Sequence, residues 1–157
     1  MRQAWLVLAA LLLASCASSK APARKVDVDA EVRQATQRYA DLVAKMDNAG
    51  IAAMFTDDGA LVNGGKTIHG PKEIEKFLDT FKQYHVQSEA ITVRTVTGKT
   101  NWAHVLGNYE QTVRLPDGSV VDAKGGYAAD WSLGSDDVWR MRRLEAFPEK
   151  TQPAAAD

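Results

Sequence analysis

The chain has 157 residues, 45% of them hydrophobic, and 19 basic and 20 acidic residues give a formal net charge of −1 at pH 7. This length is typical of a single domain, and the near balance of charges argues against a nucleic-acid partner. Cys16 is the single cysteine, so a disulfide framework within the chain is excluded.

The first 16 residues have the pattern of an export signal. Arg2 precedes an uncharged apolar run from Ala4 to Ala14, which is too short for the ~20 residues of a membrane-spanning helix. Leu13-Ala14-Ser15-Cys16 then resembles the bacterial lipobox, which implies that Cys16 is acylated and begins the mature protein. An ordinary cleaved signal and a retained helix are the alternatives.

We therefore expect four segments: a signal peptide over 1–15, a lipidated cysteine and flexible linker over 16–27, a domain over 28–148 and a disordered tail over 149–157. The lipid would hold the protein on a membrane of the cell envelope. Ala17 follows the cysteine, which by the same resemblance implies the outer membrane, facing the periplasm, in a Gram-negative cell.

The domain begins with a predicted amphipathic helix that Asp27 or Asp29 could cap. Its apolar residues recur at spacings of three and four: Val28, Val32, Ala35, Tyr39, Leu42, Val43 and Met46.

Three shorter features follow this helix. Asn48-Ala49-Gly50 predicts a break, and Ile51–Phe55 a short second helix, after which Asp57-Asp58-Gly59 turns the chain. Asn63-Gly64-Gly65-Lys66 has the composition of a hairpin turn. A third helix is expected after Gly70-Pro71, because proline suits the first helical turn.

Beyond Tyr84 the hydrophobic period changes to two. Four long antiparallel strands are predicted, over residues 86–96, 102–115, 120–133 and 138–147, and Gly125-Gly126 predicts a bulge that bends the sheet. The fold class is therefore α+β, with three N-terminal helices packed on one face of a strongly curved, mostly antiparallel sheet.

A family resemblance rests on motifs in this order: Arg38-Tyr39, Phe55-Thr56-Asp57-Asp58-Gly59-Ala60, His69-Gly70-Pro71-Lys72-Glu73-Ile74, the Ala103–Tyr109 strand, and Gly126-Tyr127 with Trp131 and Trp139. Together they resemble SnoaL-like proteins, in the superfamily of ketosteroid isomerase and nuclear transport factor 2. The resemblance covers about residues 28–147. It implies a cone-shaped, cystatin-like α+β barrel that often encloses a pocket and is often dimeric.

The resemblance also assigns three catalytic positions of the isomerases, in which an aspartate base works with two oxyanion donors. Tyr39 aligns with the donor tyrosine, the base falls on Asn63, and the second donor falls near Ala129. Asparagine cannot accept a proton at neutral pH, so no catalytic residue is assigned. For Asp57 and Asp58 we favour a capping or turn role over a paired-carboxylate site.

No metal, nucleophile or phosphate site is expected, and no cofactor is required. His69, His85 and His104 lie far apart on different elements. His104 shares a strand face with Trp102 and Leu106, and this face is expected to point outward.

Aromatic and apolar side chains on the inward faces could line a pocket for a small apolar ligand. The alternative is that they fill the core. An inward arginine of the last strand, among Arg140, Arg142 and Arg143, would instead indicate an acidic ligand. The pocket candidates are Tyr39, Met46, Phe55, Asn63, Tyr109, Tyr127, Trp131 and Trp139.

Three hypotheses for the function follow from the sequence. The first is a lipoprotein that binds a small apolar molecule without catalysis. The second is a cell-envelope module that binds a partner, or a second copy of itself, through the outer sheet face. The third is an enzyme of the SnoaL or isomerase type.

Overall fold

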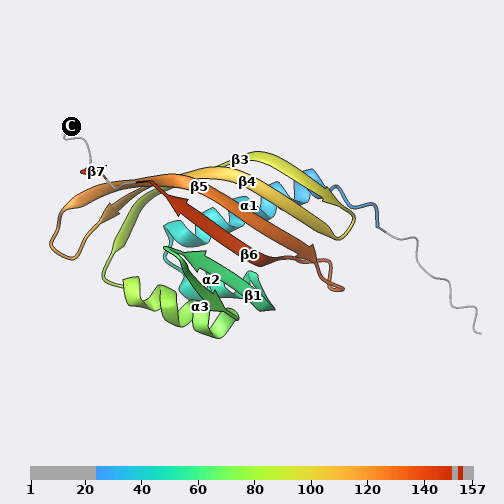
Figure 1. The fold of residues 1–157 in the computed structure, drawn as a ribbon, viewed down its shortest axis with the longest axis horizontal. Helices are drawn as coiled ribbons and strands as arrows, with labels where there is room; N and C mark the ends of the chain where they lie inside the picture. Colours follow the sequence, from blue (N-terminus) through green and yellow to red (C-terminus); the bar gives the residue numbers. More distant parts are fainter. Residues whose placement is uncertain (1–23, 150–151, 154–157) are drawn as a thin grey trace, which may run out of the picture.

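The computed structural model describes residues 24–149 and 152–153. Cys16 and the predicted signal lie outside these residues. Three helices lie on one side of a long, curved sheet (Figure 1), as expected for an α+β cone. Within the described residues, no helix is both long and apolar enough to cross a membrane.

The helices begin where the sequence provides caps. Helix α1 spans Val28–Ala44, and its N-cap Asp27 accepts a hydrogen bond from the Ala30 backbone N–H at 3.2 Å. Helix α3 spans Pro71–Leu78, with the proline in its first turn, and the 3₁₀ helix η1 continues it over Asp79–Phe81.

The second helix and the turn after it differ from prediction. Helix α2 spans Asn48–Ala53, and Phe55 begins strand β1, Phe55–Asn63. Asp57-Asp58-Gly59 therefore lies within a strand. The strand forms because Phe55 pairs with Met141 of a strand near the C-terminus. Ala60 pairs with Arg143, so a register shift between Phe55 and Ala60 accommodates the additional residues of β1, which include Asp57-Asp58-Gly59.

Strand β2 spans Lys66–His69 and forms the predicted hairpin with β1. Gly64 and Gly65 have φ values of 55° and 78°, the left-handed conformation that a two-residue hairpin loop requires.

The remaining long strands are β3, His85–Lys99; β4, Trp102–Arg114; β5, Val120–Leu133; and β6, Trp139–Pro148. The sheet order is β2-β1-β6-β5-β4-β3, in which only β1 and β6 pair in parallel among the described strands. The short strand β7, Gln152–Pro153, pairs with β5, although the sequence predicted a disordered tail there.

The predicted bulge at Gly125-Gly126 is wrong. The pairing of β4 with β5 is uninterrupted from Val120 to Ser132, and the register shifts lie elsewhere, including two between β3 and β4. Gly125 instead permits close strand packing, because a Cβ atom there would lie 2.3 Å from the carbonyl oxygen of Phe147.

One hydrophobic core joins the concave face of the sheet to the helices. Its largest fully buried side chains are Trp131, Ile74, Met141, Val32 and Val105. The segment Arg24–Asp27, part of the predicted linker, also contacts the domain, since Val26 packs against this core and Arg24 pairs with Glu31.

Candidate ligand-binding cavity

A cavity of about 290 Å³ lies between the concave face of the sheet and the helices. This volume is at the lower end of the range for small-molecule sites. Its lining is largely apolar and aromatic, with a few polar groups. The lining residues are Thr36, Tyr39, Val43, Met46, Asn48, Ile51, Leu61, Asn63, Phe77, Leu78, Phe81, Val86, Glu89, Ile91, Tyr109, Gln111, Tyr127, Ala129, Trp131, Met141, Leu144 and Ala146.

The periodicity of the elements directs these side chains inward. Tyr39 and Val43 lie one helical turn apart on α1, and Tyr127, Ala129 and Trp131 alternate along β5. Gly107 on β4 makes room for the Tyr127 ring, since a Cβ atom there would lie 2.5 Å from Tyr127 Cε1. The ring can therefore pass close to the backbone of the neighbouring strand at the wall of the cavity.

Six of the eight predicted pocket residues line the cavity: Tyr39, Met46, Asn63, Tyr109, Tyr127 and Trp131. Phe55 does not. Its side chain is 2% exposed within the core, where β1 meets β6.

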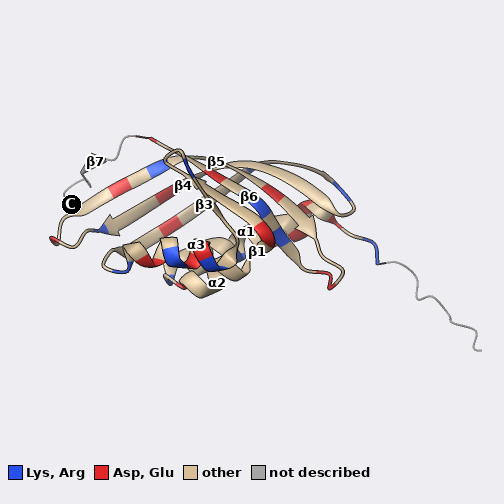
Figure 2. Ribbon diagram, turned by 60° about the horizontal axis from the view of Figure 1, so that its bottom comes forward, with Lys and Arg blue, Asp and Glu red and all other residues tan. Residues whose placement is uncertain are grey.

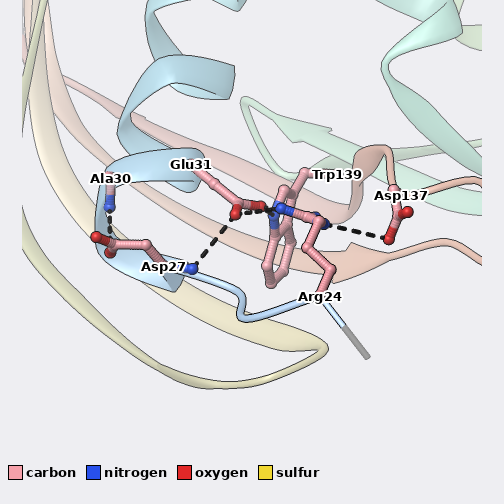
Figure 3. Close-up of polar contacts among 6 residues, drawn as sticks. All are labelled: Arg24, Asp27, Ala30, Glu31, Asp137 and Trp139. Atoms are coloured by element: carbon pink, nitrogen blue, oxygen red, sulfur yellow. Dashed lines mark hydrogen bonds and ion pairs between the residues drawn. The ribbon is translucent and has the colours of Figure 1, made fainter. Parts of the chain in front are cut away.

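Trp139 also lies outside the cavity lining. It is the first residue of β6, and its indole Nε1–H donates to Glu31 Oε2 at 3.0 Å, beside the start of α1 (Figure 3). Arg24 donates to both oxygens of Glu31, to Oε1 at 2.5 Å and to Oε2 at 3.1 Å, and lies 3.5 Å from Asp137. Arg24, and then Trp139, hold the pKa of Glu31 below its usual value. This cluster joins the start of the domain to the β5–β6 loop.

Three polar atoms of the cavity lining are buried without a hydrogen-bond partner among the described residues. They are Glu89 Oε2, the Tyr127 hydroxyl and the Trp131 indole nitrogen. A buried polar atom without a partner costs about 1–3 kcal/mol. All three belong to side chains that line one cavity, where a single bound molecule, or ordered water, could supply a partner.

Glu89 is a cavity residue that the sequence analysis missed. It lies on β3 directly opposite Gln111 of β4. Burial raises the pKa of Glu89 to about 7, although a hydrogen bond from the Gln111 side chain lowers it by a smaller amount. Among the residues that the structure describes, it is the one charged side chain in the lining. The cavity therefore combines an apolar wall with one carboxyl group.

The tyrosines of the lining stay protonated near neutral pH. Burial raises the pKa of Tyr127 to about 12. Burial, and then the Glu89 charge, raise the pKa values of Tyr39 and Tyr109. Their hydroxyl groups are therefore hydrogen-bond donors at physiological pH.

The three positions that the resemblance links to isomerase catalysis, Tyr39, Asn63 and Ala129, all line this cavity. Only Tyr39 has the matching chemistry. The Asn63 amide has no basic site at neutral pH, and the Ala129 methyl group cannot donate to an oxyanion.

The other candidate groups lie outside the cavity. Asp58 accepts a hydrogen bond from the Thr56 hydroxyl at 2.8 Å. This bond, and then a hydrogen bond from its own backbone N–H, lower the pKa of Asp58. His104 Nδ1 lies 2.6 Å from Asp130 Oδ1 on the outer sheet face, between the exposed side chains of Trp102 and Leu106. The described residues hold no cluster that could bind a metal ion.

The charged residues of the surface are mixed in sign. Figure 2 shows Lys and Arg next to Asp and Glu along α3. On β6 the arginines pair locally, Arg140 with Asp136 at 2.7 Å and Arg143 with Glu145 at 2.9 Å. No arginine of the described chain lines the cavity, so the geometry does not favour an acidic ligand.

Comparison with known proteins identifies the family of this domain. The model of the SnoaL-like domain matches residues 24–145. A steroid Δ-isomerase of Nocardioides simplex is 31% identical over 116 residues, which cover 68% of this chain and 94% of that protein.

Solved structures share the fold at lower identity. A ketosteroid isomerase-like protein from Erwinia carotovora atroseptica has a TM-score of 0.70 and 21% identity, with 77% of this chain and 95% of that chain covered. A type 2 hexachlorocyclohexane dehydrochlorinase (LinA) has a TM-score of 0.67 and 14% identity, with 82% and 90% covered. The chain thus belongs to the SnoaL-like domain family, with the cone-shaped fold of ketosteroid isomerase and nuclear transport factor 2.

Proposed function

We propose that this domain binds a small, largely apolar molecule in the cavity without converting it. The observation that carries the proposal is the cavity itself, about 290 Å³ and walled by aromatic and aliphatic side chains. Two of its polar atoms, the Tyr127 hydroxyl and the Trp131 indole nitrogen, are buried without partners. Pockets of this composition are the usual form of small-molecule sites.

Binding is favoured over an isomerase reaction because the chemistry of the lining is incomplete for the latter. The similarity to a steroid Δ-isomerase supports a ligand with a large apolar body. Proton transfer by the mechanism that the resemblance implies needs a base at Asn63, and the amide cannot supply it.

The test fills the cavity with a larger side chain from its wall. Ala146 lines the cavity and is half-buried, whereas Ala128 on the neighbouring strand pairs with the exposed Leu106 on the outer face. We expect Ala146→Trp to weaken binding of the neutral fluorescent probe N-phenyl-1-naphthylamine at least tenfold, and Ala128→Trp to leave it unchanged. Failure of the natural protein to bind the probe, or equal binding by both variants, would contradict the proposal.

We further propose that Cys16 anchors this domain to a membrane of the cell envelope. The support is the sequence Leu13-Ala14-Ser15-Cys16 after a short apolar run. Metabolic labelling with an alkyne-bearing fatty acid should mark the natural protein and not Cys16→Ser. Absence of label on the natural protein would refute the anchor.

A further inference from the structure

We propose that the ligand of the cavity is an apolar amine, and that the Glu89 carboxylate binds its protonated nitrogen. This inference rests on the proposed function, because it concerns the same cavity and names the class of molecule that fills it.

The geometry of β3 points Glu89 into the cavity. A register shift between Val86 and Ser88 changes the alternation of the strand, so that Glu89 and Ile91 share the inward face. Oε2 of Glu89 is buried and has no hydrogen-bond partner among the described residues. A ligand N–H would satisfy that oxygen.

The charge of the cavity is incomplete without a cation. In the described chain, the lining contains no lysine, arginine or histidine to pair with Glu89. Arg33 on α1, which also contacts β3, is engaged elsewhere, with Asp29 at 2.8 Å and the Val93 carbonyl oxygen at 3.2 Å. Gln111 donates a side-chain hydrogen bond to the Glu89 carboxyl but carries no charge. A buried carboxylate without a counter-charge is costly, and a ligand ammonium would provide that counter-charge.

The aromatic lining suits the same ligand class. Tyr39, Tyr109, Tyr127 and Trp131 surround the cavity, and the faces of such rings attract ammonium groups. An apolar molecule with one basic nitrogen would therefore meet a favourable partner at both its body and its charged end.

The pH dependence of binding distinguishes an amine from a neutral ligand. The titratable groups that face Glu89 are Tyr39 from α1 and Tyr109 from β4, with Glu149 also acting on Tyr109. Both tyrosines stay protonated, so Glu89 is the group that changes charge near neutral pH. An ammonium favours the ionised carboxyl, and amine affinity should rise with pH. A neutral ligand that accepts a hydrogen bond from the protonated Glu89 carboxyl would instead bind more weakly as the pH rises.

The experiment compares 1-aminoadamantane with the similarly shaped alcohol 1-adamantanol by isothermal titration calorimetry at pH 5.5 and 8. The amine stays protonated at both pH values. The Glu89 carboxyl has a pKa of about 7, so the ionised fraction of this carboxyl falls by about 30-fold from pH 8 to pH 5.5. The affinity for the amine should fall by up to the same factor. Alcohol affinity should change little.

Two variants complete the test. Glu89→Gln should bind amine and alcohol equally, whereas Glu110→Gln, on the exposed face of β4, should keep the preference for the amine. If Glu89→Gln does not fold, as judged by circular dichroism, the pH dependence of the natural protein remains decisive.

The outcomes separate the two proposals. Equal, pH-independent binding of both compounds by the natural protein would overturn the role of Glu89 and leave the cavity proposal intact. Alcohol binding that strengthens at pH 5.5 and is lost in Glu89→Gln would assign Glu89 as a donor to a neutral ligand and overturn the amine. Binding of neither compound by a protein that still binds N-phenyl-1-naphthylamine would overturn the amine and leave the cavity proposal intact, whereas a protein that binds none of the three compounds would overturn both proposals.

Discussion

Glu89 should make the stability of the empty protein depend on pH. Its pKa is raised from 4.5 to about 7 by burial in the cavity, so the folded state holds a proton that the unfolded state has released. Where the folded state binds more protons, stability falls as the pH rises. The natural protein should therefore lose stability relative to Glu89→Gln between about pH 4.5 and 7.

The size of the effect follows from the same displacement. A carboxyl group whose pKa rises from 4.5 to about 7 on folding lowers the free energy of unfolding by at most about 3 kcal/mol at a pH above both values. Glu89 is only half-buried, and solvent screening reduces this value. We compare the difference in free energy of unfolding between Glu89→Gln and the natural protein at two pH values. From pH 4.5 to pH 8 this difference should change by about 1–2 kcal/mol in favour of Glu89→Gln.

The assay is urea unfolding of both proteins at several pH values from 4.5 to 8, with Glu110→Gln as the matched control. The control removes an exposed glutamate of the neighbouring strand, and its difference in stability from the natural protein should not change with pH. A constant difference in stability between Glu89→Gln and the natural protein across this range would refute the burial of an ionisable Glu89.

Three further predictions concern packing, capping and catalysis. Gly107→Ala should lower the free energy of unfolding by about 1–3 kcal/mol in urea titrations, because its Cβ would lie 2.3 Å from the Thr92 carbonyl oxygen. Gly126→Ala, whose Cβ would meet no atom closer than 3.7 Å, should cost nothing, and equal losses would contradict this packing. Asp27→Ala should cost about 1 kcal/mol by removing the N-cap of α1, and an unchanged melting temperature would argue against that cap. The natural protein should not isomerise a steroid substrate in a spectrophotometric assay, whereas turnover that is lost in Tyr39→Phe would reveal another base.

Much of the fold follows from local sequence signals. The apolar stripe of α1, the proline at the start of α3 and the Gly64-Gly65 loop each have one favourable geometry, and the structure adopts it. Phe55 was misplaced because a run of five apolar residues does not distinguish the end of a helix from the start of a strand. Pairing with Met141 on β6, which is distant in sequence, decides the outcome.

The cavity was predictable in part. Alternation identified the inward face of β5, and with it Tyr127 and Trp131. It could not show that Trp139, at the first position of β6, meets Glu31 rather than the cavity. Glu89 was missed because a carboxyl group is not expected inside, although its spacing to Ile91 and Val93 was the available signal. The register shift after Val86 obscured that pattern.

Native mass spectrometry of the protein isolated from its own cells tests the central claim most directly. The account predicts a reproducible extra mass that is released on unfolding and is absent from Ala146→Trp, whose larger side chain would occupy part of the cavity. A natural protein that carries no extra mass and also takes up none of the apolar probes would contradict the account.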